Sequence, residues 1–287
     1  MRVRNLNVLI SKAADRLRRA GIDAGQAEAE IILCHLLDCQ RLELYLESNQ
    51  RLTETVIARF DEIIARRLTR YPLQYILGQA WFYGRPFAVD ERVMVPCPET
   101  ELLLEAVVRT ARQMKRRPVR LLDIGTGSGV IAVSAALENR EMEITATDLS
   151  PDALAVARHN AEKLAGDRPI RFIQSDLFAG LPPGETFDII ASNPPYIADG
   201  AYDGLPPEVK ADPPLALLAG EKGMDVIEKI LRQAPDYIRR PGALIFEIGY
   251  DQADIIFAIV AADRRYGRCS LIKDLADIDR IVLCKLE

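Results

Sequence analysis

The chain has 287 residues, of which 49% are hydrophobic and 28% are charged, and its formal net charge is -5. This length and composition describe an ordinary soluble protein that can bury two hydrophobic cores. The first 70 residues contain 12 Lys and Arg against 10 Asp and Glu, and the rest contains 25 against 32, so neither part offers the basic surface that nucleic-acid binding requires.

The sequence also argues against membrane insertion and secretion. No stretch approaches the roughly 20 apolar residues that span a bilayer. The first 17 residues are interrupted by Lys12, Asp15 and Arg16 before a signal-length apolar segment forms. Five cysteines at positions 34, 39, 97, 269 and 284, without a C-x-x-C pair, predict reduced thiols. We therefore expect a cytoplasmic enzyme.

The N-terminal part shows apolar residues at helical spacing over residues 6–17, 26–37 and 53–68. These segments predict a small helical domain over residues 1–78. Within it, Cys34, His35 and Cys39 are close enough in sequence to suggest a metal site. Because a fourth ligand is not nearby, an ordinary helix and its end explain them better, and we expect no metal.

Near position 80 the helical pattern gives way to aromatic and Gly-Pro-containing sequence. Residues 79–95 predict a hairpin linker, and residues 99–115 predict a helix. From position 119 strands and helices alternate regularly, which indicates a doubly wound α/β sheet over residues 96–287 with its ligand at the carboxyl ends of the strands. The β-rich runs 243–248 and 280–284 extend this sheet, with an antiparallel strand expected at its edge.

A glycine-rich segment follows the first apolar run of this sheet. Residues 121–124 lead into Gly125-Thr126-Gly127-Ser128-Gly129 and then a mostly apolar stretch, 130–137. A strand, a glycine turn and a helix start allow the backbone to approach a nucleotide-like ligand closely. The third glycine of the dinucleotide fingerprint would fall at Val130, so the spacing disfavours NAD and FAD. S-adenosylmethionine has no pyrophosphate to place at the helix N-terminus, and we predict that it binds at residues 125–129.

Acidic residues end the next two apolar runs. Asp148 lies about 20 residues after the glycines, where a carboxylate accepts hydrogen bonds from both ribose hydroxyls. Alternatively, Asp148 helps to begin the helix that follows Ser150. After residues 170–173, Asp176 is placed to accept from the adenine amine and Leu177 to cover the ring. Taken alone, a solvated loop carboxylate and a core residue explain these two positions better, but the order of motifs at successive strand ends favours a cofactor site.

The segment Asn193-Pro194-Pro195-Tyr196 follows the apolar run 187–191. The Asn193 side-chain oxygen and the Pro194 carbonyl can each accept one N–H of a planar NH2 group, while the two prolines fix the backbone. Tyr196 is placed to lie against the flat group that carries the nitrogen. An amide nitrogen is a poor nucleophile until it is held in line with an electrophile, here a methyl group. We predict that Asn193, Pro194 and Tyr196 are catalytic and that residues 193–196 bind the substrate; the alternative is a turn after a strand.

Together these motifs resemble the class I methyltransferases, and within them the protein-(glutamine-N5) methyltransferases of peptide-chain release factors. The resemblance extends along the chain to residues 72–78, 81–87, 95–101, 212–220, 223–225 and 273–280. It implies a Rossmann-like methyltransferase sheet and S-adenosylmethionine as the cofactor, contacted by residues 125–129, Asp148, Leu177 and Asn193. It further implies that residues 193–196 receive the glutamine of the Gly-Gly-Gln motif in class 1 release factors, and that the helical domain docks this partner.

One position departs from the family pattern. The family usually has Arg-Pro-Glu-Thr-Glu where this chain has Cys97-Pro98-Glu99-Thr100-Glu101. A thiol cannot replace the five N–H donors of a guanidinium, so the group that the family Arg holds has another partner here or none. No His lies near Cys97 in sequence, and a filler explains Cys97 better than a nucleophile.

Two other functions are open from the sequence alone. One is an N6-adenine methyltransferase acting on nucleic acid, or a methyltransferase of another protein; the former should have a positive groove and a means to flip its base. The basic spots at residues 16–19 and 115–117 are better explained by a solvated helix face and a helix end. We therefore expect no direct nucleic-acid partner. The third possibility is a non-catalytic module that binds the cofactor and docks a translation protein.

Overall fold

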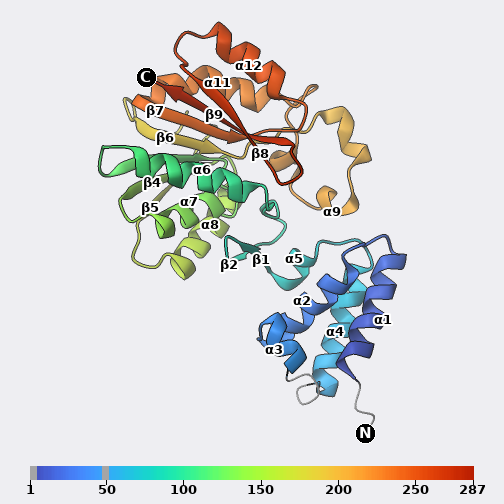
Figure 1. Cartoon of the computed structure of the whole chain (residues 1–287). Coiled ribbons are helices and arrows are strands. Elements are labelled where there is room, and N and C mark those ends of the chain that lie inside the picture. Colours follow the sequence, from blue (N-terminus) through green and yellow to red (C-terminus); the bar gives the residue numbers. More distant parts are fainter. Residues whose placement is uncertain (1–4, 47–51) are drawn as a thin grey trace. The chain divides into compact units, whose positions relative to one another are not determined.

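A computed structural model of the chain describes residues 5–46 and 52–287 (Figure 1). The first four residues of the stretch tested for a signal segment therefore lie outside the described residues. The chain divides into two compact units, Met1–Gly78 with Pro206–Ala211, and Gln79–Leu205 with Asp212–Glu287. The short segment 206–211 thus belongs to the helical unit, although the sequence placed it in the methyltransferase domain. In the part of the chain that is described, every helix is too short or too polar to cross a bilayer.

The helical unit packs its amphipathic helices around one core. Its helices are α1 (Leu6–Arg19), α2 (Gly25–Leu37), α3 (Arg41–Leu46), α4 (Glu54–Arg67), α5 (Leu73–Leu77) and the short α9 (Pro207–Lys210). The Asn5 and Thr53 side chains accept backbone N–H groups at the starts of α1 and α4, which satisfies donors that a helix start leaves unpaired. Leu17, Ile32 and Phe60 are buried between the helices. The helices predicted over residues 6–17, 26–37 and 53–68 are confirmed.

A buried ion cluster holds α9 in this unit. Arg67 is 5% exposed and donates from Nε to Glu28 Oε2 at 2.7 Å and from Nη1 to Glu208 Oε1 at 2.8 Å. Arg70 donates to the two oxygens of Glu208 at 2.6 and 2.7 Å. Such paired, charge-assisted hydrogen bonds are stronger than neutral ones. Burial alone would raise the pKa of Glu208, but the hydrogen bonds from Arg70 and Arg67 outweigh it and lower the pKa to about 2.

A hairpin begins the second unit. It consists of β1 (Gln79–Phe82) and β2 (Arg85–Ala88), and Tyr83 and Gly84 form its turn with φ of 49° and 73°. Two central residues with positive φ fit the twist of a tight hairpin. The Tyr83 N–H donates to Glu101 at 2.7 Å, which fixes the hairpin to the start of the following helix. The hairpin predicted within residues 79–95 therefore occupies its first ten positions.

A seven-stranded, mostly parallel sheet forms the rest of this unit. Its strands lie in the order β5-β4-β3-β6-β7-β9-β8, and only the pairs made by β9 are antiparallel. The bounds are β3 (Val119–Ile124), β4 (Met142–Asp148), β5 (Ile170–Gln174), β6 (Phe187–Ser192), β7 (Ile238–Glu247), β8 (Cys269–Lys273) and β9 (Asp279–Leu286). The predicted doubly wound α/β class is confirmed.

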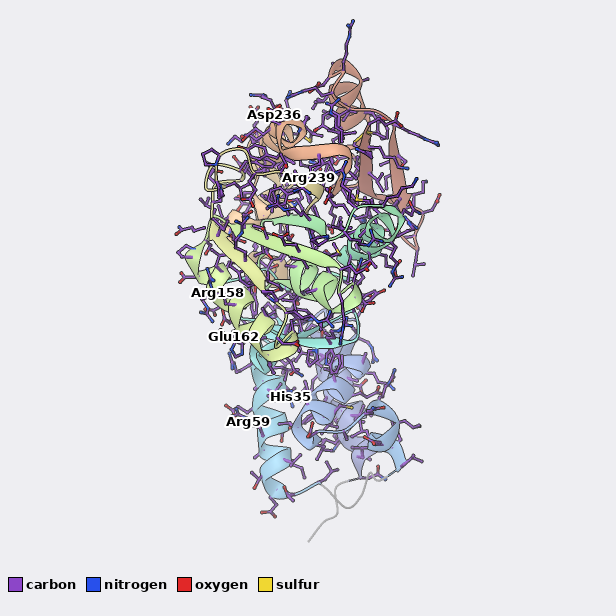
Figure 2. All side chains as sticks on the ribbon, turned by 90° about the vertical axis from the view of Figure 1, so that its left-hand side faces the viewer. His35, Arg59, Arg158, Glu162, Asp236 and Arg239 are labelled. Atoms are coloured by element: carbon purple, nitrogen blue, oxygen red, sulfur yellow. A yellow bond between two sulfur atoms is a disulfide. The ribbon has the colours of Figure 1, made fainter. Side chains whose placement is uncertain are left out.

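Helices cover both faces of the sheet (Figure 1). On one face, Leu121 and its neighbours on the adjacent strands pack against the first three helices of this unit. These are α6 (Thr100–Gln113), α7 (Val130–Glu138) and α8 (Pro151–Leu164). On the other face, Leu122 and its neighbours pack against α11 (Asp225–Tyr237) and α12 (Ala253–Ala262). Successive side chains of a strand point to opposite faces of the sheet, so Leu121 and Leu122 belong to different cores. Arg158 and Glu162 on α8 and His35 on α2 are among the exposed polar residues (Figure 2).

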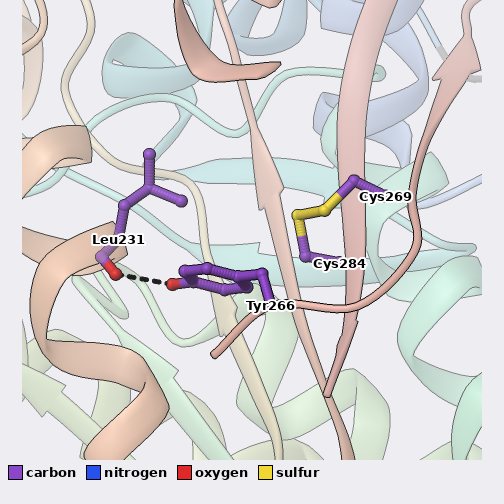
Figure 3. The surroundings of a disulfide bond; sticks show 4 residues. All are labelled: Leu231, Tyr266, Cys269 and Cys284. Atoms are coloured by element: carbon purple, nitrogen blue, oxygen red, sulfur yellow. Dashed lines mark hydrogen bonds between the residues drawn. A yellow bond between two sulfur atoms is a disulfide. The ribbon is translucent and has the colours of Figure 1, made fainter. Parts of the chain in front are cut away.

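The far end of the sheet differs from the sequence expectation in two ways. β9 is antiparallel as expected, but it lies one strand in from the edge because β8 covers it. Cys269 and Cys284 lie directly opposite each other on these two strands and form a disulfide beside Tyr266 (Figure 3). The prediction of five reduced thiols was therefore wrong for this pair. A separation of 15 residues gave no sign of it, because the pairing depends on a strand that the sequence analysis did not identify.

Candidate active site

A pocket lies at the carboxyl ends of the central strands. Ile124 is in register with Thr147 of β4 and with Ser192 of β6, so these three strands end at the same level. The chain continues from β3 to β4 on one side and returns with β6 on the other, and ligands bind where the strand order reverses in this way. The predicted residues that line the pocket are Gly125, Thr126, Gly127, Ser128, Asp148, Asp176, Leu177, Asn193, Pro194 and Pro195; Gly129 and Tyr196 do not line it.

The glycine loop leaves open space for a ligand. Gly125 and Gly127 have φ of 68° and 55°, and a Cβ added to either would meet no protein atom within 4 Å. These backbone angles favour glycine, and both residues line the pocket. Gly129 has another role, because its φ is 84° and an added Cβ would lie 3.2 Å from Ala157. It allows α7 to start close to α8.

A buried carboxylate that the sequence analysis missed supports this loop. Asp123 Oδ2 accepts from Thr126 Oγ1 at 2.6 Å and from the Ala132 N–H at 3.2 Å. Burial raises the pKa of Asp123 to about 7, and the two hydrogen bonds only partly oppose this. Its Oδ1 is buried without a hydrogen-bond partner among the described residues, which also favours the neutral form. The available signal was an acidic residue within the otherwise apolar run 121–124.

Asp148 joins the loop to the second strand. Its Oδ2 accepts the Gly127 N–H at 2.9 Å and its Oδ1 accepts the Ser150 N–H at 2.9 Å. The cap of α8 is Ser150, whose hydroxyl accepts the Ala153 N–H at 3.2 Å, so Asp148 precedes the cap residue. Each carboxylate oxygen has a second acceptor site. Asp148 can therefore accept from ligand hydroxyl groups while it holds the loop.

The loop after β5 brings Asp176 and Leu177 to the pocket. Leu177 has φ of 50°, a region that side chains other than glycine adopt with strain. Ser175 holds this turn, because its hydroxyl donates to the Leu177 carbonyl and accepts the Gly180 N–H, both at 2.8 Å. A strained residue at a pocket wall is typical of functional sites.

The segment after β6 presents Asn193 and Pro194 to the pocket. The Ser192 hydroxyl donates to the Ile124 carbonyl at 2.8 Å and fixes the end of β6 to β3. Asn193 Nδ2 donates to Thr100 Oγ1 at 3.0 Å. Tyr196 does not line the pocket and packs against the core beneath the second face of the sheet. Burial raises the pKa of Tyr196, and the charge of Glu247 adds to the shift. The Tyr196 carbonyl accepts from Gln252 Nε2 at 3.2 Å.

Cys97 lies close to Tyr196 and Glu247 but has no catalytic environment. Burial raises the pKa of the Cys97 thiol to about 12, with Glu247, Glu99 and Asp212 adding to the shift. The thiol contacts only the Val95 carbonyl, at 3.8 Å, among the hydrogen bonds of the described residues. A protonated thiol is a weak nucleophile, and this supports the interpretation of Cys97 as a filler.

In the helical unit, burial and the neighbouring Cys39 raise the pKa of Cys34 to about 11.

Much of the pocket wall is apolar and was not predicted. A loop before α6, the first turns of α7, the helix α10 (Pro214–Leu217) and the start of α11 contribute to it. The apolar residues include Val93, Met94, Val130, Ile131, Leu215, Leu218 and Val226. An apolar wall with a few convergent polar groups is typical of a small-molecule site. These residues have no sequence signature that separates them from core residues.

The comparisons with known proteins agree along the chain. The PrmC N-terminal domain family matches residues 9–78, and the methyltransferase small domain family matches residues 98–205. The hMettl16 catalytic domain, solved with an RNA hairpin, superposes with a TM-score of 0.58 at 15% identity, covering 78% of this chain and 82% of that one. At this identity the superposition shows a shared fold only.

Two curated relatives are similar over nearly their whole length. The release factor glutamine methyltransferase of Koribacter versatilis is 39% identical over 97% of both chains. The protein of the same name from Rhodopirellula baltica is 38% identical over 96% of this chain and 94% of its own. Matches of this extent cover nearly the whole chain and therefore both units. The chain belongs to the release factor glutamine methyltransferase family.

Proposed function

We propose that this chain transfers a methyl group from S-adenosylmethionine to the side-chain amide nitrogen of the glutamine in the Gly-Gly-Gln motif of class 1 peptide-chain release factors. The observation that supports this most is that Asn193 and Pro194 line the same pocket as the glycine loop and Asp148. An acceptor pair for an NH2 group is thus close to the predicted cofactor site. The names of the curated relatives support the choice of substrate.

The pocket residues fit the cofactor. The open backbone at Gly125 and Gly127 leaves room for its amino-acid portion, Asp148 accepts from the ribose hydroxyls, and Asp176 and Leu177 receive the adenine. When bound, S-adenosylmethionine supplies an electrophilic methyl group on a sulfonium. The protein then has to bring a nitrogen into line with that carbon and keep water from it.

The chain's own part in the chemistry is positioning. Asn193 Oδ1 and the Pro194 carbonyl accept the two amide hydrogens of the target glutamine and aim its nitrogen. As the nitrogen–carbon bond forms and the sulfur–carbon bond breaks, the amide proton becomes strongly acidic and leaves to water. Good alignment supplies about 7–11 kcal/mol of a barrier, whereas one general base contributes about 10²- to 10⁴-fold. Positioning therefore accounts for the activity without a His or Cys nucleophile.

The partner and the location follow from the substrate. A release factor is a protein of the translation machinery, so the proposal places the enzyme in the cytoplasm and gives it a protein partner. The helical unit is proposed as the docking part. No direct contact with nucleic acid is part of the proposal, since neither part of the sequence is strongly basic.

Transfer of labelled methyl groups tests the proposal. The protein is incubated with labelled S-adenosylmethionine and a release factor, DNA or RNA. Label on the release factor, lost when its Gly-Gly-Gln glutamine is replaced, is the expected result. Label on nucleic acid would instead indicate an adenine methyltransferase, and label on none of the three would indicate a non-catalytic module.

An Asn193→Ala variant tests the assigned role. It should abolish transfer and leave cofactor binding largely in place, because Asn193 is proposed to act on the glutamine. Asn139→Ala is the matched control, since Asn139 lies at the end of α7 in the same unit and does not line the pocket. Transfer that survives Asn193→Ala at the control rate would contradict the assignment.

A further inference from the structure

Three polar side chains from three elements are joined by hydrogen bonds at the pocket wall, which Asn193 and Thr100 line and from which Glu247 is set back. Asn193 Nδ2 lies 3.0 Å from Thr100 Oγ1, and Thr100 Oγ1 lies 2.8 Å from Glu247 Oε2. Thr100 is the first residue of α6 and Glu247 is the last residue of β7. Because Ser192 is in register with Phe246, Asn193 and Glu247 follow at neighbouring strand ends. Neither Thr100 nor Glu247 has a sequence signature that indicates such a role.

The Thr100 hydroxyl has a single hydrogen, and this determines which group donates in each of the two hydrogen bonds. Thr100 and Glu247 are each 2% exposed, so water does not supply alternative partners readily. A hydroxyl group has one hydrogen, and when it is donated to an ionised carboxylate the Thr100 oxygen can only accept on its other side. The amide of Asn193 must then turn its NH2 group toward Thr100. Its Oδ1 faces the opposite way.

We infer that Thr100 and Glu247 are positioning residues that set the amide orientation of Asn193, so that Oδ1 and not the NH2 group meets the target amide. This inference rests on the proposed function of Asn193 as an acceptor. An Asn side chain is nearly symmetric in shape, and only its hydrogen-bond partners determine which end faces a ligand. With the NH2 group outward, two donors would face each other and the target nitrogen would not be held.

The ionisation of Glu247 controls the same orientation. A protonated Glu247 can donate to Thr100 Oγ1, and the hydroxyl hydrogen then becomes available for Asn193 Oδ1. When both hydrogen bonds are reversed in this way, the NH2 group of Asn193 faces outward. The geometry therefore couples transfer to the ionised form of one buried carboxylate.

The surroundings place this ionisation near neutral pH. Burial raises the pKa of Glu247 to about 7; the Thr100 hydrogen bond opposes the shift, Glu99 adds to it and Arg280 opposes it. The titratable groups that face Glu247 from the adjoining loops are Cys97 and Tyr196. Burial raises the pKa of both, so both are neutral near pH 7. Glu247 is thus the member of this cluster whose charge changes there.

Three variants test the inference. Thr100→Val keeps the shape and removes the hydroxyl, and it should lower kcat by about 10- to 100-fold, because a small misplacement of a reacting group has an effect of this size. Thr100→Ser restores the hydroxyl and should recover most of that loss. Thr110→Val is the matched control, since Thr110 is half-buried on the same helix α6 and does not line the pocket. Glu247→Gln should remove the rise of wild-type kcat expected between about pH 6 and about pH 8.

Equal kcat for Thr100→Val and wild type, failure of Thr100→Ser to rescue, or an unchanged pH profile in Glu247→Gln would each overturn the inference.

A second readout separates this inference from the proposed function. In protein with isotope-labelled asparagine, the Asn193 Nδ2 hydrogen that is donated to Thr100 should be protected from exchange in wild type and Thr100→Ser but not in Thr100→Val. This measurement needs no substrate. If wild type methylates no release factor and yet shows the protection, the proposed function fails and the orientation stands. If transfer occurs but Thr100→Val leaves the protection unchanged, the orientation fails and the function stands.

Discussion

The Gly127 N–H donates to Asp148 Oδ2 at 2.9 Å and so joins the glycine loop to the tip of the second strand. One carboxylate thereby shapes the loop and faces the same pocket. The loop conformation also depends on positive φ at Gly127. Loop geometry and ligand binding should therefore respond together to a change at this glycine.

Gly127→Ala should weaken S-adenosylmethionine binding by at least about tenfold, because alanine at φ of 55° strains the backbone by about 1–2 kcal/mol and places a methyl group at the pocket. Isothermal calorimetry measures the affinity. Gly184→Ala is the matched control, since Gly184 is exposed with φ of 76° and open space around it. Both variants should lose similar stability. Equal loss of affinity in both would show that strain alone, and not the pocket, is responsible.

A pH-dependent stability difference should identify Asp123. Its pKa is raised by burial from the ordinary 3.8 to about 7, so between these values the folded chain binds a proton that the unfolded chain has lost. Folding stability from this group therefore falls as pH rises through this window and is constant above it. Relative to Asp123→Asn, the wild type should lose on the order of 4 kcal/mol across the window in urea unfolding. Parallel stability curves for the two proteins would contradict a neutral Asp123.

The order of motifs along the chain was enough to predict part of this site. Asp148 and Asn193 each follow an apolar run, and parallel strands bring their carboxyl ends to one edge of a sheet. The glycine loop could be predicted for the same reason. The hydrogen bonds that join Asn193, Thr100 and Glu247 could not be predicted, because they depend on the lateral register of β6 with β7 and on where α6 begins.

Long-range pairing also explains what the sequence left out of the fold. Glu208 binds Arg67 and Arg70, which lie more than 130 positions earlier, and so α9 packs with a unit that is distant in sequence. The half-polar segment Cys269–Lys273 has a weak strand pattern, yet β9 provides a partner for it. No local pattern encodes either association.

The ion cluster around Arg67 should make the helical unit sensitive to Glu208. Glu208→Gln should destabilise it by about 1–3 kcal/mol at neutral pH, because Arg67 is buried and loses one charged partner. The folded-state pKa of about 2 lies below the ordinary 4.5, so this stabilisation is complete above about pH 4.5 and is lost as pH falls toward 2.

Chemical unfolding, monitored by the far-UV circular dichroism of the helices, measures this loss of stability. Glu62→Gln is the matched control, since the Arg59–Glu62 pair is exposed and should contribute less than about 0.5 kcal/mol. A loss from Glu208→Gln no larger than that from the control would show that the cluster adds no net stability.

The disulfide between Cys269 and Cys284 predicts a specific thiol count. In oxidised, unfolded protein a thiol reagent should modify three cysteines, Cys34, Cys39 and Cys97, and after reduction it should modify five. Closing a loop of 15 residues restricts the unfolded chain, so reduction should lower stability by up to about 3 kcal/mol. Because β8 is the edge strand and β9 its only neighbour in the described sheet, this loss should appear as earlier exchange of amide hydrogens in β8. Five reactive thiols before any reductant is added would show that the two cysteines remain reduced and that the ladder of β8 and β9 holds this edge without a covalent bond.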